Sequence, residues 1–161
     1  MMNFSVALRQ PPLEPWFDWP FFIALAWAGF SSHAILVMYA LNLFYQFFIH
    51  TEIVGKLPRW VESVLNTPSH HRVHHGTNPE YIDRNYGGVL IVWDRLFGSF
   101  EPEVASVKYG VLHPVTSRNP FYIAFHLWAD IVRDVLKPSS LATKLKLIFA
   151  PPGWADEQRE L

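Results

Sequence analysis

The longest part of the chain without a charged side chain runs from residue 19 to residue 51 and contains 33 residues. A single membrane-spanning helix needs about 20 apolar residues, and two need about 40 with a turn between them. The stretch is therefore too long for one crossing and short for two. The residues from Gly29 to His33 interrupt it with turn character, and Ser32 is a candidate N-cap. We expect two short helices, over about 20–29 and 34–50, folded as a membrane-embedded hairpin.

Aromatic side chains flank this stretch. Trp16, Trp19 and Trp27 on one side and Tyr39 and Tyr45 on the other suit anchoring at a membrane interface. A buried core hairpin of a soluble protein is the alternative, because apolar helices of this length also occur in protein cores.

The composition changes after residue 52. Residues 53–161 carry 12 of the 13 basic and 11 of the 14 acidic residues. This part predicts a cytosolic cap of short helices, among them one from Pro120 to about Lys137 with Asn119 as N-cap, and one over about 140–149. The expected fold is all-α, a single domain over 1–161 with a membrane hairpin in 1–52 and the cap in 53–161.

Two features of the composition narrow the function. Positive and negative charges nearly cancel, and no basic stripe predicts a nucleic-acid partner. The chain has no cysteine, so a metal site must use nitrogen and oxygen ligands.

Histidines gather at one place, in the run Thr67-Pro68-Ser69-His70-His71-Arg72-Val73-His74-His75-Gly76. Thr67 and Pro68 predict the start of a helix, and Gly76 its end. On that helix His71, His74 and His75 stand at i, i+3 and i+4, so their imidazoles share one face. This spacing allows one metal ion to collect three nitrogen ligands. His70 points about 100° away from His71 and is a candidate for either a metal ligand or a supporting residue.

His50 is a fourth candidate ligand. It closes the apolar run Phe47-Phe48-Ile49-His50, where a membrane helix reaches the interface and the histidine triplet is expected. Metal ligands are commonly oriented by neighbouring acceptors. Asp94 could accept the second ring proton of a ligand histidine, or form an ion pair with Arg95 or Arg84. Asn85 could support the site or make a turn before Gly87-Gly88.

Four blocks of sequence resemble the C-terminal signature of the fatty acid hydroxylase/sterol desaturase superfamily, and most closely its alkylglycerol monooxygenase-like branch. The blocks are Tyr45–Glu52, Asn66–Gly76, Asn85–Gly88 and Trp93–Phe100. The resemblance implies a helical membrane enzyme with two irons in a histidine-rich site, which uses O₂ to hydroxylate or desaturate a lipid. By position, His71, His74 and His75 match the last histidine box, as catalytic residues and metal ligands, and His50 matches the isolated ligand before it.

The resemblance also implies partners. The lipid substrate would be a sterol, a fatty acyl chain or an ether lipid, and the branch suggests tetrahydrobiopterin as electron donor. An external donor is needed in any case, because the chain has no dinucleotide fingerprint and no haem-attachment motif. The enzyme would be integral to a bacterial inner membrane or to the endoplasmic reticulum.

Complete members of the superfamily carry two further histidine boxes upstream of this region. Residues 2–10 resemble the segment that follows the second box, so we expect an N-terminally truncated domain that is inactive alone, or one completed by a separate N-terminal half. Two other functions remain open. One is a zinc-dependent membrane hydrolase, although the H-E-x-x-H signature is absent; the other is a non-catalytic membrane subunit.

Overall fold

A computed structural model describes residues 2–8, 14–112, 115–150 and 154. Within these residues the chain is helical and has no strand, only two isolated β-bridges, Leu65 with Leu90 and Gly76 with Tyr109. The all-α prediction is confirmed. The chain divides into two compact units, Met1–Pro114 and Val115–Leu161, and the histidine cluster belongs to the first. The single-domain boundaries stay a prediction.

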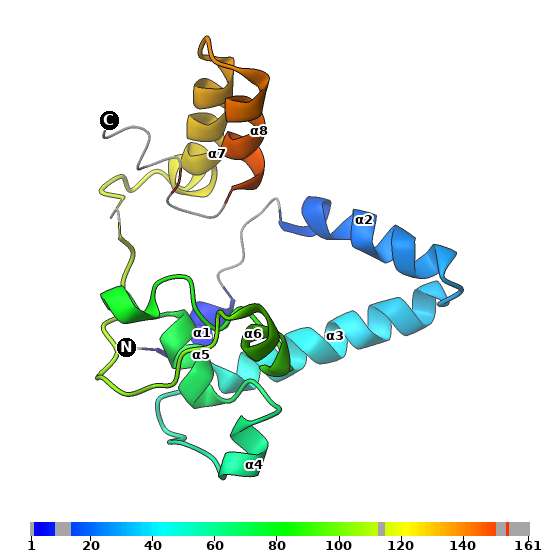
Figure 1. Cartoon of the computed structure of the whole chain (residues 1–161), viewed down its shortest axis with the longest axis vertical. Helices are drawn as coiled ribbons and strands as arrows, with labels where there is room; N and C mark the ends of the chain where they lie inside the picture. Colours follow the sequence, from blue (N-terminus) through cyan, green and yellow to red (C-terminus); the bar gives the residue numbers. More distant parts are fainter. Residues whose placement is uncertain (1, 9–13, 113–114, 151–153, 155–161) are drawn as a thin grey trace. The chain divides into compact units, whose positions relative to one another are not determined.

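Two apolar helices, α2 (Glu14–Trp27) and α3 (Ser32–Ile49), form the predicted hairpin (Figure 1). At the end of α2, Gly29 has a left-handed φ of 96°. The Phe30 N–H bonds the Leu25 carbonyl and the Gly29 N–H bonds the Ala26 carbonyl, which is the hydrogen-bond pattern of a helix closed by glycine. The chain thereby reverses direction within a few residues.

Two details of the hairpin differ from the sequence-based expectation. The first helix begins at Glu14, and Pro20 lies inside it rather than at its start. The N-cap of α3 is Ser31, whose hydroxyl accepts a hydrogen bond from the Ala34 N–H, and Ser32 is the first helical residue. Two consecutive serines offer the same cap chemistry, so composition alone does not choose between them.

Helix α3 is, among the described helices, the one long and apolar enough to cross a membrane. Only Ile49 of its 18 residues is buried. Leu36, Met38 and Phe44 each expose 64% of their surface. An apolar face of this size needs to be covered by lipid or by another protein. This exposure agrees with the predicted location of the hairpin in a membrane.

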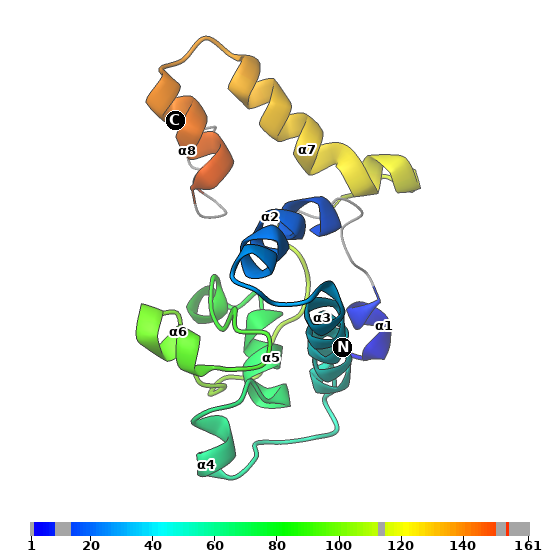
Figure 2. The same cartoon turned by 90° about the vertical axis from the view of Figure 1, so that its right-hand side faces the viewer.

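The remainder of the first unit surrounds the end of α3 that carries His50. Helix α1 (Phe4–Ala7) stacks Phe4 on Phe47, with ring centroids 4.9 Å apart. On another side of α3 lies α5 (Pro68–His74), as the view in Figure 2 shows. The other short elements of this unit are α4 (Arg59–Glu62), a 3₁₀ turn (Pro79–Tyr81) and α6 (Val92–Phe97).

The second unit is a pair of helices, α7 (Pro120–Leu136) and α8 (Leu141–Phe149), that pack against each other. Asn119 caps α7 as predicted, through its side-chain oxygen and the N–H groups of Phe121 and Tyr122. Ser140 caps α8. Ion pairs at i, i+3 follow α7, Asp130 with Arg133 and Asp134 with Lys137.

Candidate metal centre

The histidine-bearing helix α5 is short and buried. Thr67 is its N-cap and Pro68 its first residue, because proline has no N–H to leave unsatisfied at that position. Residues 68–73 are all buried. The seven residues of α5 give two turns that carry His71 and His74, and His75 is the C-cap residue that follows them.

The structure brings the His50 ring against this helix. Its Nε2 lies 3.0 Å from Nε2 of His71 and 3.2 Å from Nε2 of His75. The ligand atoms of these three residues all lie within 4.8 Å of one another. Residues 21 to 25 positions apart in sequence therefore meet at the point where α3 ends.

Backbone carbonyls fix the orientation of two of the rings. Nδ1 of His50 lies 2.6 Å from the Gln46 carbonyl oxygen, and Nδ1 of His74 lies 3.2 Å from that of Arg84. A carbonyl only accepts, so in the neutral rings Nδ1 carries the proton and Nε2 carries the lone pair. Such second-nitrogen hydrogen bonds are typical of histidines that bind metals.

Burial keeps the cluster neutral. It lowers the pKa of His50, His71 and His75, and the neighbouring imidazoles lower each pKa further. The pKa of His75 falls to about 4, and that of His71 falls well below its ordinary value. Neutral imidazoles present lone pairs at physiological pH, as metal binding requires.

The nitrogen spacing fits a metal ion. With metal–nitrogen bonds of about 2.1 Å, neighbouring ligand atoms are about 3.0 Å apart in octahedral and about 3.4 Å apart in tetrahedral geometry. The two short Nε2–Nε2 distances, 3.0 and 3.2 Å, lie within this range. Nδ1 of His71 is buried and has no hydrogen-bond partner among the described residues.

His74 stands beside this trio. Its ring centroid lies 5.5 Å from that of His71 and 5.1 Å from that of His75, and Tyr86 meets it edge-on at 5.8 Å. It shares the face that the spacing predicted, but its ligand atom is not part of the tight group of three. Ligation by all four histidines stays a prediction.

Of the three supporting candidates, His70 lies on a different side of α5. Its Nε2 is 3.9 Å from Glu62, and its ring packs edge-on against Phe100. Asn85 holds the same helix from outside: its amide donates to the carbonyls of His70 (3.1 Å) and Glu101 (2.8 Å). Both residues contact the backbone or the far side of α5, so they position the helix.

Asp94 makes neither of the two contacts that the sequence suggested. Its carboxylate accepts hydrogen bonds from the Tyr86 N–H at 2.7 Å, the Gly87 N–H at 2.8 Å and the Ser99 hydroxyl at 2.7 Å. A buried carboxylate with three donors fixes the segments that bear them, the loop with Tyr86 and Gly87 before α6 and Ser99 after it. This loop carries Tyr86 against the His74 ring, so Asp94 is linked to the histidine cluster through the loop.

Arg72 makes a structural link beside the histidines that sequence reasoning missed. It lies inside the histidine box, and its guanidinium is buried in a bidentate pair with Glu103, at 2.7 and 2.6 Å. The same group donates to the carbonyls of Thr51 and Val54, at 3.1 and 2.7 Å. Arg72 therefore joins α5 to the loop that directly follows His50. The signal available in the sequence was a basic residue, Arg72, between two of the candidate ligand histidines.

The remaining histidines are elsewhere. His33 is exposed in the first turn of α3. His126 is half-buried on α7, where Nδ1 lies 3.1 Å from the Tyr122 carbonyl. His113 lies outside the described residues.

Comparison with known proteins shows which family this chain resembles. The family model described as fatty acid hydroxylase matches residues 1–99. The chain is 43% identical to alkylglycerol monooxygenase of Xenopus tropicalis, 44% to that of Homo sapiens and 42% to that of Danio rerio. These matches cover 94% of this chain and 34% of each relative, so the chain spans about a third of their length. No solved structure matches significantly.

Proposed function

Because the chain belongs to the fatty acid hydroxylase family, we propose that it forms the membrane-anchored, metal-binding part of a lipid oxygenase. His50, His71 and His75 would hold an iron ion. His74 would be a fourth ligand of the same iron or would bind a second metal. The observation that carries the proposal is the meeting of three neutral imidazoles, at metal-ligand spacing, where an uncharged helix ends.

When bound, iron would supply the O₂ chemistry that no amino-acid side chain provides. The chain's own residues do the rest. The carbonyls beside His50 and His74 hold the rings in the tautomer that leaves Nε2 free. Arg72 keeps α5 and the end of α3 at a fixed separation, and the buried position of α5 limits access of water.

The relatives' name suggests the reaction, a monooxygenation of alkylglycerols, which are ether lipids. We extend this substrate class to the present chain, in preference to a sterol or a fatty acyl chain. An apolar hairpin beside the metal site suits a lipid that reaches the site from the bilayer. Tetrahydrobiopterin, or another external donor, would supply the electrons.

The described donors serve one metal ion. Two irons require more ligands than four imidazoles, and the buried Nδ1 of His71 also needs a partner. We therefore propose that further ligands come from a part of the enzyme beyond these 161 residues. On this reasoning the isolated chain binds iron but does not turn over lipid.

A zinc hydrolase fits the geometry less well. Such an enzyme needs three nitrogen or oxygen ligands, a water and a nearby general base. Glu52, the acid nearest to His50 in sequence, lies at the surface and accepts a hydrogen bond from the Met2 N–H at 2.5 Å. No carboxylate of the described residues joins the histidine group.

Iron binding tests the proposal. The chain, purified in detergent and loaded with Fe²⁺ without oxygen, should bind one equivalent, which nitric oxide converts to a high-spin signal in electron paramagnetic resonance. His75→Ala should abolish the signal, and His33→Ala, the matched exposed histidine, should leave it intact. A signal that survives His75→Ala would refute the assignment.

A further inference from the structure

Helix α6 is inside out compared with an ordinary surface helix. Its carboxylate residue, Asp94, is only 2% exposed, whereas Leu96 and Phe97 expose 70% and 77% of their surface and Trp93 exposes 54%. A helix on a water-facing surface normally buries its apolar side and exposes its charges. We call Trp93, Leu96 and Phe97 the apolar face of α6. Its exposure indicates that a medium other than water covers it.

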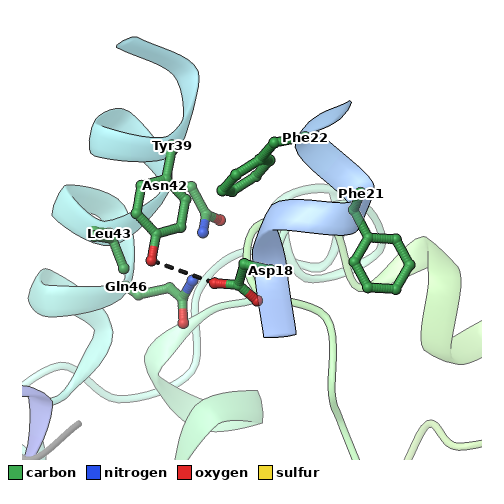
Figure 3. Close-up of a pocket in the computed structure, with 7 residues that line it drawn as sticks. All are labelled: Asp18, Phe21, Phe22, Tyr39, Asn42, Leu43 and Gln46. Carbon is green, nitrogen blue, oxygen red and sulfur yellow. Dashed lines mark hydrogen bonds between the residues drawn. The ribbon is translucent and has the colours of Figure 1, made fainter. Parts of the chain in front are cut away.

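The loop before α6 lies directly against α3. A Cβ atom on Gly88 would stand 2.9 Å from Nε2 of Gln46 and 3.0 Å from Oδ1 of Asn42, so the Gly88 backbone packs on these two side chains. Both lie on one side of α3, as Figure 3 shows. Helix α6 begins at Val92, four residues after Gly88, and is therefore held close to the same part of α3.

A second contact joins this loop to α3. The Tyr45 hydroxyl of α3 donates to the Asn66 carbonyl at 2.7 Å. The Asn66 N–H in turn donates to the Val89 carbonyl at 2.7 Å. The residues on both sides of the isolated bridge therefore lie along the last turns of α3.

These contacts set the depth of α6 relative to α3. Along the helix axis Gln46 lies about 6 Å and Asn42 about 12 Å from His50. The last turns of α3 still expose Phe44 and Phe48, by 64% and 52%, so lipid is the expected surrounding at this level. The headgroup region on each side of a bilayer is about 5–8 Å thick. Helix α6 therefore lies near the level where headgroups meet hydrocarbon.

Basic side chains stand beside the apolar face. Arg95 of α6 lines one cavity together with Lys56 and Arg59. Within the part of the chain that the structure describes, the side chains of Lys56 and Arg59 form no ion pair. Tryptophan and other apolar side chains next to lysine and arginine are typical of helices that lie in a membrane interface, where the cations contact headgroup phosphates.

Two carboxylates share this cavity but are bonded to other groups. Glu103 pairs with Arg72 at 2.6 Å. The Glu62 carboxylate accepts hydrogen bonds from the Ser69 hydroxyl at 2.8 Å and the Leu57 N–H at 2.9 Å. Neither carboxylate forms an ion pair with Lys56 or Arg59, so these cations are available to an outside group.

We propose that α6 is a second membrane-contact element of this chain, outside the apolar hairpin. Its apolar face enters the boundary between headgroups and hydrocarbon in the leaflet where α3 ends, and Arg95 contacts headgroup phosphates. Lipid is the occupant because the face continues the exposed apolar turns of α3 at the same depth. Part of the segment expected to be a cytosolic cap then lies in the membrane interface.

The contact has a consequence for the histidines. Asp94 binds the Tyr86 N–H, and the Tyr86 ring meets the His74 ring edge-on. Helix α6 on one side and α3 on the other would therefore hold the histidine cluster at one depth. The proposal does not depend on which metal or substrate the cluster takes.

Site-directed spin labelling tests the proposal. The chain has no cysteine, so one introduced cysteine carries a nitroxide at one known position. The metal-free 161-residue chain, one copy per phosphatidylcholine nanodisc, is exposed to oxygen, which concentrates in the bilayer, and to a water-soluble nickel chelate. Power saturation in electron paramagnetic resonance compares the two collision rates. Labels at Leu96→Cys and Phe97→Cys should favour oxygen, as should Leu41→Cys, an exposed position on α3.

Val104→Cys is the matched control. Val104 is also apolar and 82% exposed, but its N–H binds the Tyr81 hydroxyl, in the segment that follows α5. A label at this position should favour the nickel chelate. Exposure of an apolar residue is then separated from its depth.

Leu96→Asp separates insertion from mere proximity. A carboxylate at this depth is costly, so the label at Phe97→Cys should shift from oxygen toward nickel, while the label at Leu41→Cys should not. The Leu96 side chain is largely exposed, so circular dichroism should show unchanged helix content. Val104→Asp should shift neither label.

Labels on α6 that favour nickel would show that water covers the helix and would overturn the proposal. Labels that neither reagent reaches would show a protein contact instead, which would overturn it equally. Because no metal is present, both results would leave the iron-binding assignment standing. A chain whose α6 labels favour oxygen but which fails to bind iron would support the membrane contact and reject the oxygenase.

Discussion

Replacement of Arg72 by Met tests how the candidate metal centre is held together. The guanidinium is one of the few buried charged groups of the first unit, with side-chain exposures of 8% for Arg72 and 17% for Glu103. It makes two bonds to that carboxylate and two to the Thr51 and Val54 carbonyls. Methionine keeps much of the side-chain volume and removes all four bonds.

The expected cost follows from the groups left without partners. Removing one partner of a buried ion pair destabilises a protein by about 3–5 kcal/mol. Glu103 is near the surface and regains some water, which places the loss near the lower limit, about 3 kcal/mol. Because the lost bonds join α5 to the residues after His50, the distance between His50 and His71 should also lose its constraint, and iron affinity should fall.

Denaturant unfolding in detergent, followed by circular dichroism, measures the first effect, and Fe²⁺ titration measures the second. The matched control is Arg133→Met on α7, whose guanidinium is exposed and pairs with Asp130; it should cost less than about 1 kcal/mol and leave iron affinity unchanged. If Arg72→Met costs no more than Arg133→Met and binds iron normally, the positioning role of Arg72 is wrong.

Three further perturbations address the loop, the close packing and the protonation of the site. Asp94→Asn replaces an acceptor of three hydrogen bonds by an amide with a single acceptor oxygen. In a denaturant titration it should destabilise the first unit by about 2 kcal/mol. An unchanged unfolding midpoint would contradict the role of Asp94 in fixing the loop. Gly87→Ala places a Cβ 2.5 Å from the Leu90 carbonyl oxygen, so it should lower the unfolding midpoint, whereas Gly55→Ala, with open space around it, should not. The pKa of His75 is depressed to about 4 from an ordinary 6.5, so the unfolded chain binds more protons between these values. This contribution to the stability of the metal-free chain should therefore be complete above about pH 6.5 and be lost as the pH falls through about 4. A stability that rises on acidification over this range would refute the neutral cluster.

The sequence was sufficient to predict the elements whose ends carry their own chemistry. Asn119 before Pro120 and Thr67 before Pro68 each mark a helix start with a cap and a proline, and both were found. The convergence of His50 on His71 and His75 followed from the uncharged helix that ends at His50 and from the resemblance to a known family.

Interactions that depend on tertiary folding could not be predicted. The carbonyls that orient His50 and His74 are backbone atoms, and every residue has one. The partners of Asp94 come from the backbone of a loop that folds back on α6, and Arg72 reaches carbonyls about 20 residues away in sequence. The place of α6 beside α3 likewise appears only when the loop before α6 folds against Asn42 and Gln46.

Iron K-edge X-ray absorption of the Fe²⁺-loaded chain tests the central claim most directly, because it counts the imidazoles bound to the metal. The account predicts at least three nitrogen ligands at about 2.0–2.2 Å with the outer-shell scattering of imidazole rings, and the loss of this pattern in both His50→Ala and His71→Ala. A spectrum dominated by oxygen ligands, or one that either substitution leaves unchanged, would contradict the claim that these histidines form the metal centre.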